Sequence, residues 1–175
     1  MPKNFKDDFI TIQSNLRDNS GGTTAAFEVT TRQRAGLLSE VAIRDFRIKI
    51  DEPTSLGGSD QGPNPVELVL AALGACQEIT YRLYADTLGI PLNAVSVKLT
   101  GRLDLRGFFA VDEGVRPGLR DIHATVTIDS PASTDDIERL KATVDRHCPV
   151  LDILRNVTPV KTEYALLHSL SKTAA

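Results

Sequence analysis

Residues 65–89 read PVELVLAALGACQEITYRLYADTLG, a long run of residues that favour helix. Asn64 is a suitable N-cap, Pro65 suits the first helical position, and Glu67 can complete a capping box. Gly89 is a typical helix stop. The segment therefore predicts a helix of roughly 37 Å at ~1.5 Å per residue. Its first half is apolar nearly all round, so we expect it to be buried on every side.

Shorter segments on both sides of this helix alternate apolar and polar residues with the period of a strand. The expected strands are residues 25–31, 37–43, 46–50, 94–105, 121–129 and 160–167. We also expect helices over residues 135–145, capped by Ser133 or Thr134, and over residues 150–156. Runs of adjacent strands favour the α+β class with antiparallel sheets over a doubly wound parallel fold.

The chain has 175 residues, of which 41% are apolar and 25% charged. This composition suits one compact domain with a real core, or one subunit of an intertwined oligomer. We expect a loose N-terminal arm over residues 1–24, with one short strand near residues 9–13. Residues 25–175 are expected to form one domain that ends in a frayed tail over residues 169–175.

Bulk properties argue against several classes of function. The net charge is −3 and the pI about 5.6, and the chain contains no Trp, so a nucleic-acid or anionic-membrane partner is not expected. No apolar stretch reaches transmembrane length and no secretory signal is visible, so we expect a cytoplasmic protein without a membrane partner. Two cysteines are too few for a disulfide-stapled scaffold.

The two cysteines are the best candidates for chemistry. Cys76 lies in the apolar half of the long helix, where a thiol is inert unless a cation from another segment lies near it. Cys148 follows His147 and precedes Pro149, at the start of a short helix whose amides lower a thiol pKa. On position alone a structural core role is favoured for Cys76, and the single Cys148-Pro149 pair is a weak signal by itself.

A metal site would require both cysteines to converge with His123, His147 or His168, and no zinc-ligand spacing is present. No dinucleotide, P-loop or nucleophile-elbow motif is present either. We therefore expect no metal and no cofactor.

Residues 56–76, LGGSDQGPNPVELVLAALGAC, resemble the central signature of the OsmC/Ohr family of osmotically inducible and organic hydroperoxide resistance proteins. The Cys148-Pro149 pair resembles the family's second element, and the likeness extends over roughly residues 25–167. The resemblance is closest to the broad OsmC-like branch. It implies antiparallel β-sheets wrapped around a long central helix in an intertwined homodimer, with the sites at the subunit interface.

The resemblance also implies a function, that of a thiol-dependent peroxidase that reduces organic hydroperoxides in oxidative stress defence. Cys76 corresponds to the peroxidatic cysteine and Cys148 to the resolving cysteine, and a dithiol would be the reductant. The arginine that stabilises the thiolate corresponds to Arg34, with Arg32 as the fallback.

The family's glutamate is where the sequence departs from the pattern. In the peroxidases it directly follows the proline of the Asn-Pro pair, a position held here by Val66. Glu67 comes one residue later, and Asp60 is another candidate carboxylate. Glu67 lies roughly 13 Å from Cys76 along a continuous helix and cannot touch it within that helix.

An apolar pocket around Cys76, lined by Leu68, Val69, Leu73 and Ile79, would favour apolar substrates of the peroxidase. Two other functions compete with this one. A non-catalytic homodimer that binds a small apolar ligand is the alternative, with the Phe108-Phe109 pair and the long helix lining its site. A peroxide sensor ranks last, because the sequence offers no partner domain.

Overall fold

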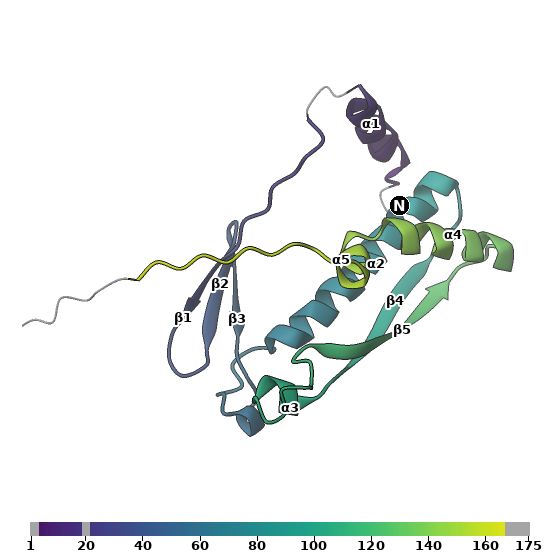
Figure 1. Ribbon diagram of the computed structural model, residues 1–175. Coiled ribbons are helices and arrows are strands. Elements are labelled where there is room, and N and C mark those ends of the chain that lie inside the picture. Colours follow the sequence, from purple (N-terminus) through teal and green to yellow (C-terminus); the bar gives the residue numbers. More distant parts are fainter. Residues whose placement is uncertain (1–3, 19–21, 167–175) are drawn as a thin grey trace, which may run out of the picture.

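The computed structural model describes residues 4–18 and 22–166. Its elements follow one another along the chain (Figure 1). They are α1 (Lys6–Arg17), β1 (Thr30–Gln33), β2 (Ser39–Ile43), β3 (Phe46–Ile50), η1 (Thr54–Leu56), α2 (Pro65–Leu88), β4 (Ala94–Leu103), α3 (Leu105–Phe108), β5 (Leu119–Asp129), α4 (Thr134–His147) and α5 (Pro149–Arg155). The predicted α+β class with antiparallel sheets and a long helix is confirmed.

The strands form two antiparallel sheets. β1, β2 and β3 make a three-stranded meander, and β4 pairs with β5 in a two-stranded ribbon with a register shift at Arg102/Leu103. The ribbon and the helices α2, α4 and α5 form one body, and the three-stranded sheet stands to one side of it (Figure 1). The long helix therefore has only the ribbon as a sheet neighbour within this body.

Helix α2 begins and ends as its sequence predicts. The Asn64 side chain accepts from the Glu67 amide, and the Glu67 carboxylate accepts from the Asn64 amide, which completes the capping box. Gly89 ends the helix in the left-handed conformation. None of the helices in residues 4–18 and 22–166 combines the length and the hydropathy needed to cross a lipid bilayer.

Two apolar clusters hold α2 in place. The larger cluster joins the C-terminal half of α2 to α4. Its buried members are Tyr81, Ala85, Ile90, Leu92, Leu140 and Val144. The smaller cluster lies near the middle of α2 and contains Leu73, Cys148 and Leu151, with Cys76 packed against it. Burial of these side chains supplies the main favourable free energy of the fold.

A buried aspartate organises the loop that leads into α2. Asp51 is 1% exposed and accepts hydrogen bonds from the Ser59 hydroxyl and from the amides of Ser59, Gln61 and Glu52. These bonds, that from the Ser59 hydroxyl above all, keep the pKa of Asp51 below its ordinary 3.8 although burial opposes the shift. A Cβ at Gly58 would lie 1.8 Å from the Glu52 carbonyl oxygen, so this close approach requires glycine.

The N-terminal segment differs from its prediction. Residues 9–13 lie inside α1 and form no strand. Phe9 packs edge-on against Tyr84 with ring centroids 5.3 Å apart, and the Phe5 amide donates to Asp86 of α2. The helix forms instead because its aromatic side chain finds a partner on α2, a tertiary contact that local patterning does not show.

The predicted last strand over residues 160–167 is also absent from the described residues. Residues 156–166 have no regular secondary structure and run away from α5 (Figure 1). Leu167 and the tail predicted over residues 169–175 lie outside the described residues. Val157, Val160, Tyr164 and Leu166 are each more than two-thirds exposed. A segment with strand-like alternation forms a strand only beside a second strand edge, and none pairs with it here.

Candidate active site

The two sulfur atoms lie side by side. Cys76 comes from the middle of α2, and Cys148 occupies the junction where α4 ends and α5 begins. The Cys148 thiol donates to the Cys76 sulfur over 3.3 Å, and both thiols are free. A disulfide needs about 2.05 Å between sulfurs, so an approach of little more than 1 Å would link them.

The exposure of the two cysteines is the reverse of the sequence expectation. Cys76 was expected deep in the core, but it is only half-buried. Cys148 was expected at the mouth of a helix, but it is 1% exposed. Cys148 is enclosed because the break between α4 and α5 folds back onto Leu73 of α2 and Leu151 of α5. An external reagent therefore reaches Cys76 more easily.

Burial also reverses the expected direction of the Cys148 pKa. Removal of the thiol from water raises its pKa above the ordinary 9.0, and the neighbouring Cys76 adds to the rise. The amides of Leu151 and Val150 act in the expected, lowering direction, but they do not outweigh the loss of solvent. Cys148 is therefore held as a thiol that can donate to Cys76.

The His147 side chain packs outside the sulfur pair. Its ring is exposed and stacks on Tyr84 with centroids 5.3 Å apart and an interplanar angle of 24°. Tyr84 in turn contacts Phe9 of α1. This aromatic stack fixes the end of α4 against α2 and so fixes the backbone position of Cys148.

Arg34 lies in the three-stranded sheet. It follows β1, and its guanidinium pairs with Glu40 of β2 at 2.6 Å. Arg32, the fallback, is exposed and lies opposite Glu40 in the β1–β2 register. Among the described residues, no hydrogen bond or ion pair joins a Lys or Arg side chain to either sulfur. Within one protomer the predicted cation and the thiol pair are therefore not brought together.

The candidate carboxylates are likewise engaged elsewhere. Glu67 is exposed and closes the capping box of α2 with Asn64. Asp60 is exposed, at a positive φ of 56°, and its amide donates to the Glu52 carbonyl. Val66 lines a cavity beside α2. The part of the chain that the structure describes holds no cluster of His, Cys, Asp and Glu with metal-ligand geometry.

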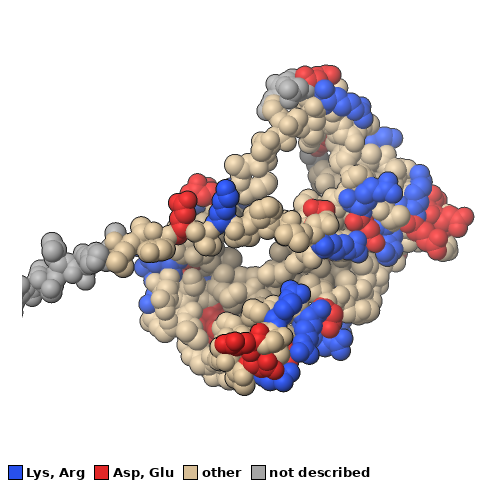
Figure 2. All heavy atoms as spheres, in the orientation of Figure 1, with Lys and Arg blue, Asp and Glu red and all other residues tan. Residues whose placement is uncertain are grey.

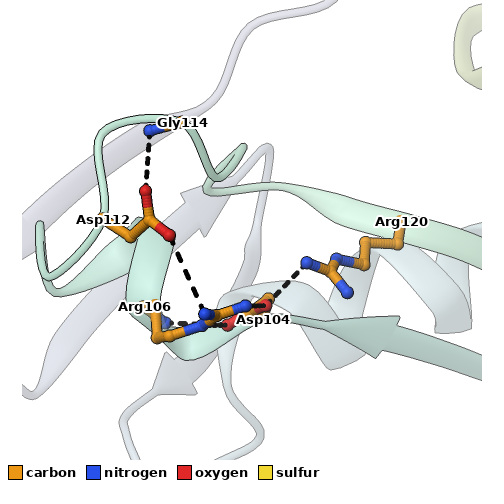
Figure 3. A network of polar contacts seen from close by, with 5 residues as sticks. All are labelled: Asp104, Arg106, Asp112, Gly114 and Arg120. Carbon is orange, nitrogen blue, oxygen red and sulfur yellow. Dashed lines mark hydrogen bonds and ion pairs between the residues drawn. The ribbon is translucent and has the colours of Figure 1, made fainter.

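A network of charges stiffens the β4–β5 connection. Asp104 accepts from Arg106 at 2.8 Å and from Arg120 at 2.6 Å, and Asp112 accepts from the Gly114 amide (Figure 3). The hydrogen bonds from Arg106 come first among the causes that lower the pKa of Asp104 from 3.8 to about 2. The network supports the loop that presents Phe108 and Phe109 to solvent.

The chain is similar to known proteins in both sequence and fold. The sequence profile of OsmC-like proteins matches residues 58–163, which is more than half of the chain and includes both cysteines. The chain belongs to the OsmC-like family. The OsmC-like chain is 29% identical over 127 residues to a protein named hydroperoxide reductase from Mycoplasma pneumoniae. That match covers 70% of this chain and 83% of the relative.

Solved OsmC-like structures share the fold. An OsmC-like protein from Mycoplasma pneumoniae superposes with a TM-score of 0.68 at 24% identity, over 77% of this chain and 91% of that one. An organic hydroperoxide resistance protein from Legionella pneumophila superposes with a TM-score of 0.60 at 21% identity, over 76% and 91%. The OsmC-like fold of this chain is thereby established.

Three residues of interest escaped the sequence reasoning. Asp51 organises the entry to α2, Glu40 holds Arg34, and Gln77 lies buried next to Cys76. Gln77 carried a visible signal, since it is a polar residue inside an otherwise apolar helical run. Glu40 carried none, because pairing with Arg34 depends on the β1–β2 register.

Proposed function

We propose that this OsmC-like chain is a thiol peroxidase that reduces organic hydroperoxides, with Cys76 as the peroxidatic and Cys148 as the resolving cysteine. The Cys76 thiolate attacks the terminal oxygen of R–O–O–H and breaks the O–O bond. R–O⁻ takes up a proton and leaves as an alcohol, and Cys76 becomes a sulfenic acid. Cys148 then attacks the Cys76 sulfur, which releases water and forms a disulfide. An external dithiol restores both thiols by exchange.

The observation that carries the proposal is the 3.3 Å approach of two thiols from segments far apart in the sequence. The half-exposed Cys76 is open to a substrate, and the enclosed Cys148 is held as a thiol until the sulfenic acid forms. An apolar cluster around them suits an organic rather than an inorganic peroxide.

The working unit that we propose is a homodimer. Among the described residues of one protomer, the sulfurs have no cation partner. Arg34 pairs with Glu40 in the three-stranded sheet, and this sheet stands to one side of the helical body (Figure 1). The exposed apolar side chains of residues 157–166 also require cover. A second copy that wraps its three-stranded sheet around α2 would meet both needs, with Arg34 as the thiolate-stabilising residue.

The decisive experiment is consumption of cumene hydroperoxide by the reduced protein with a dithiol, beside the variants Cys76→Ser and Cys148→Ser. We expect turnover in the wild type and none in Cys76→Ser. Without the dithiol, which would itself reduce a sulfenic acid, Cys148→Ser should consume one equivalent of the hydroperoxide and accumulate the sulfenic acid, which dimedone traps for mass spectrometry. A wild type with both thiols free and no turnover would sink the proposal.

A further inference from the structure

A cavity of about 700 Å³ lies between α2, β5, α4 and α5. One face of α2 forms its floor, with Val69, Leu73, Gln77 and Tyr81 spaced at successive turns, and Leu151 closes it from α5. The volume is within the range of small-molecule sites in proteins, roughly 300–1,000 Å³. Neither Cys76 nor Cys148 lines this cavity, so it is separate from the sulfur pair.

Gln77 gives this cavity an unsatisfied polar group. The residue is only 5% exposed and lines the cavity wall. Among the described residues, its Oε1 atom has no hydrogen-bond donor. Buried amide oxygens are nearly always paired, because leaving one without a donor costs free energy. A ligand hydroxyl in the cavity would supply the missing donor.

The charges around the cavity favour an anion. Its lining contains four cations but only two carboxylates, Asp121 and Asp145. These carboxylates already pair with Arg102 and Lys141. Most of the charge in the lining is thus neutralised within the protein.

Two of the lining cations, Arg116 and Arg155, are exposed and make no ion pair with another described residue. In Figure 2, basic side chains lie near α5 and, together with acidic ones, around the α3–β5 connection. Guanidinium groups at the open side of an apolar cavity suit a carboxylate.

We infer that this cavity binds an organic carboxylate with an apolar chain and a hydroxyl group. The hydroxyl donates to Gln77 Oε1 at the buried wall, the chain lies along Val69, Leu73 and Leu151, and the carboxylate meets Arg116 and Arg155. Leu73 and Leu151 also pack against Cys148. An occupant of the cavity therefore contacts the far side of the residues that enclose the resolving thiol.

The test is calorimetric titration of the reduced protein with 12-hydroxydodecanoate, with dodecanoate and 1,12-dodecanediol as comparison probes. We expect saturable binding of the hydroxy acid, with weaker binding of the acid that lacks the hydroxyl and of the uncharged diol. Gln77→Met should weaken the hydroxy acid about tenfold and leave dodecanoate unchanged. Arg116→Gln and Arg155→Gln should each weaken both acids severalfold.

Control variants separate the site from general effects. Arg146→Gln removes an exposed cation of α4 outside the cavity lining and is expected to leave binding unchanged. The midpoint of urea unfolding of Gln77→Met should equal or exceed that of the wild type, because the substitution removes a buried amide oxygen that has no donor. Equal affinity of the wild type for the two acids would overturn the inference. So would an equal loss of affinity in Arg146→Gln, or a marked loss of stability in Gln77→Met.

This inference does not rest on the peroxidase chemistry. Cys76→Ser should bind 12-hydroxydodecanoate as the wild type does, since the sulfur does not line the cavity. Binding that persists without turnover would retain the ligand site and reject the peroxidase. Turnover without binding would retain the peroxidase and reject the ligand site.

Discussion

Cys76 and Cys148 lie in contact, but their surroundings give them different chemistry. Cys148 is enclosed by Leu73 and Leu151 and its thiol pKa is raised, whereas Cys76 is half-buried. Such an asymmetry suits a pair in which one thiol meets the oxidant and the other waits for the oxidised product. The difference arises from packing, since both residues lie on or beside helices.

We predict that iodoacetamide labels Cys76 before Cys148 in the reduced protein. Reagent access and thiolate fraction both disfavour Cys148, so its labelling should be roughly tenfold or more slower at neutral pH. Because the Cys148 pKa is raised, its labelling should increase as the pH rises beyond the ordinary 9.0. Peptide mass spectrometry after short labelling pulses measures both rates, and equal rates would contradict the assignment.

Asp104 makes a prediction about pH and stability. Its pKa of about 2 lies below the ordinary 3.8, so its contribution to stability is present above pH 3.8 and is lost as the pH falls through 2. The free energy of unfolding of the wild type should therefore fall more steeply between pH 4 and pH 2 than that of Asp104→Asn. Urea titrations at several pH values test this.

Arg106→Gln is the matched variant for Asp104. It removes the partner whose hydrogen bonds lower the Asp104 pKa most, so the loss of stability on acidification should be smaller than in the wild type and complete at a higher pH. An unchanged pH profile in Arg106→Gln would show that the network in Figure 3 does not hold the carboxylate in solution.

Helix α2 shows how local signals place a candidate catalytic residue. Its capping box fixes the start at Pro65, and from there the helical period fixes which face carries Leu73, Gln77 and Tyr81. Asp51 anchors the preceding loop, so the entry to the helix is held as well. A shift of the start would rotate Cys76 relative to Cys148.

We predict that Asn64→Ala lowers the free energy of unfolding by about 1 kcal/mol, the usual cost of losing an N-cap. Ser133→Ala is the matched variant, because Ser133 caps α4 with the same bond to a backbone amide. Both should show similar losses in urea unfolding. Only Asn64→Ala should also slow disulfide formation between the cysteines, and an effect on that rate from Ser133→Ala alone would contradict this account of α2.

At the level of the assembled protein, the separation of Arg34 from the sulfurs is the main feature to explain. The three-stranded sheet and the segment of residues 157–166 both leave the body that holds the cysteines (Figure 1). In a dimer with a two-fold axis, each copy would bring its Arg34 to the sulfur pair of the other copy, and would receive that copy's Arg34 at its own sulfur pair.

We predict that Arg34→Ala lowers peroxidase activity at least tenfold, and that its mixture with Cys76→Ser, unfolded and refolded together, regains part of it. If Arg34 acts across the interface, half of the dimers are mixed and each has one complete site, so about a quarter of wild-type activity returns. Action within one chain would restore nothing. Light scattering on the wild type should give twice the 19.0 kDa chain mass, and a monomer would contradict the arrangement.

The sequence alone determined the elements that depend on neighbouring residues. The capped helix α2, strand β3 and the Ser133 cap of α4 were predicted because capping, glycine stops and apolar period act within a few residues. The signature around Cys76 and the Cys148-Pro149 pair also indicates the OsmC-like family.

Only the tertiary structure decided what depends on contacts between distant segments. It brought Cys76 and Cys148 together and enclosed Cys148, because α5 folds back onto α2. It made residues 9–13 a helix through the contact of Phe9 with Tyr84. It left the Gln77 amide unpaired in a cavity built from four elements. Burial and pairing of this kind are properties of the packed chain, and a raised thiol pKa or an unpaired acceptor follows from them rather than from residue identity.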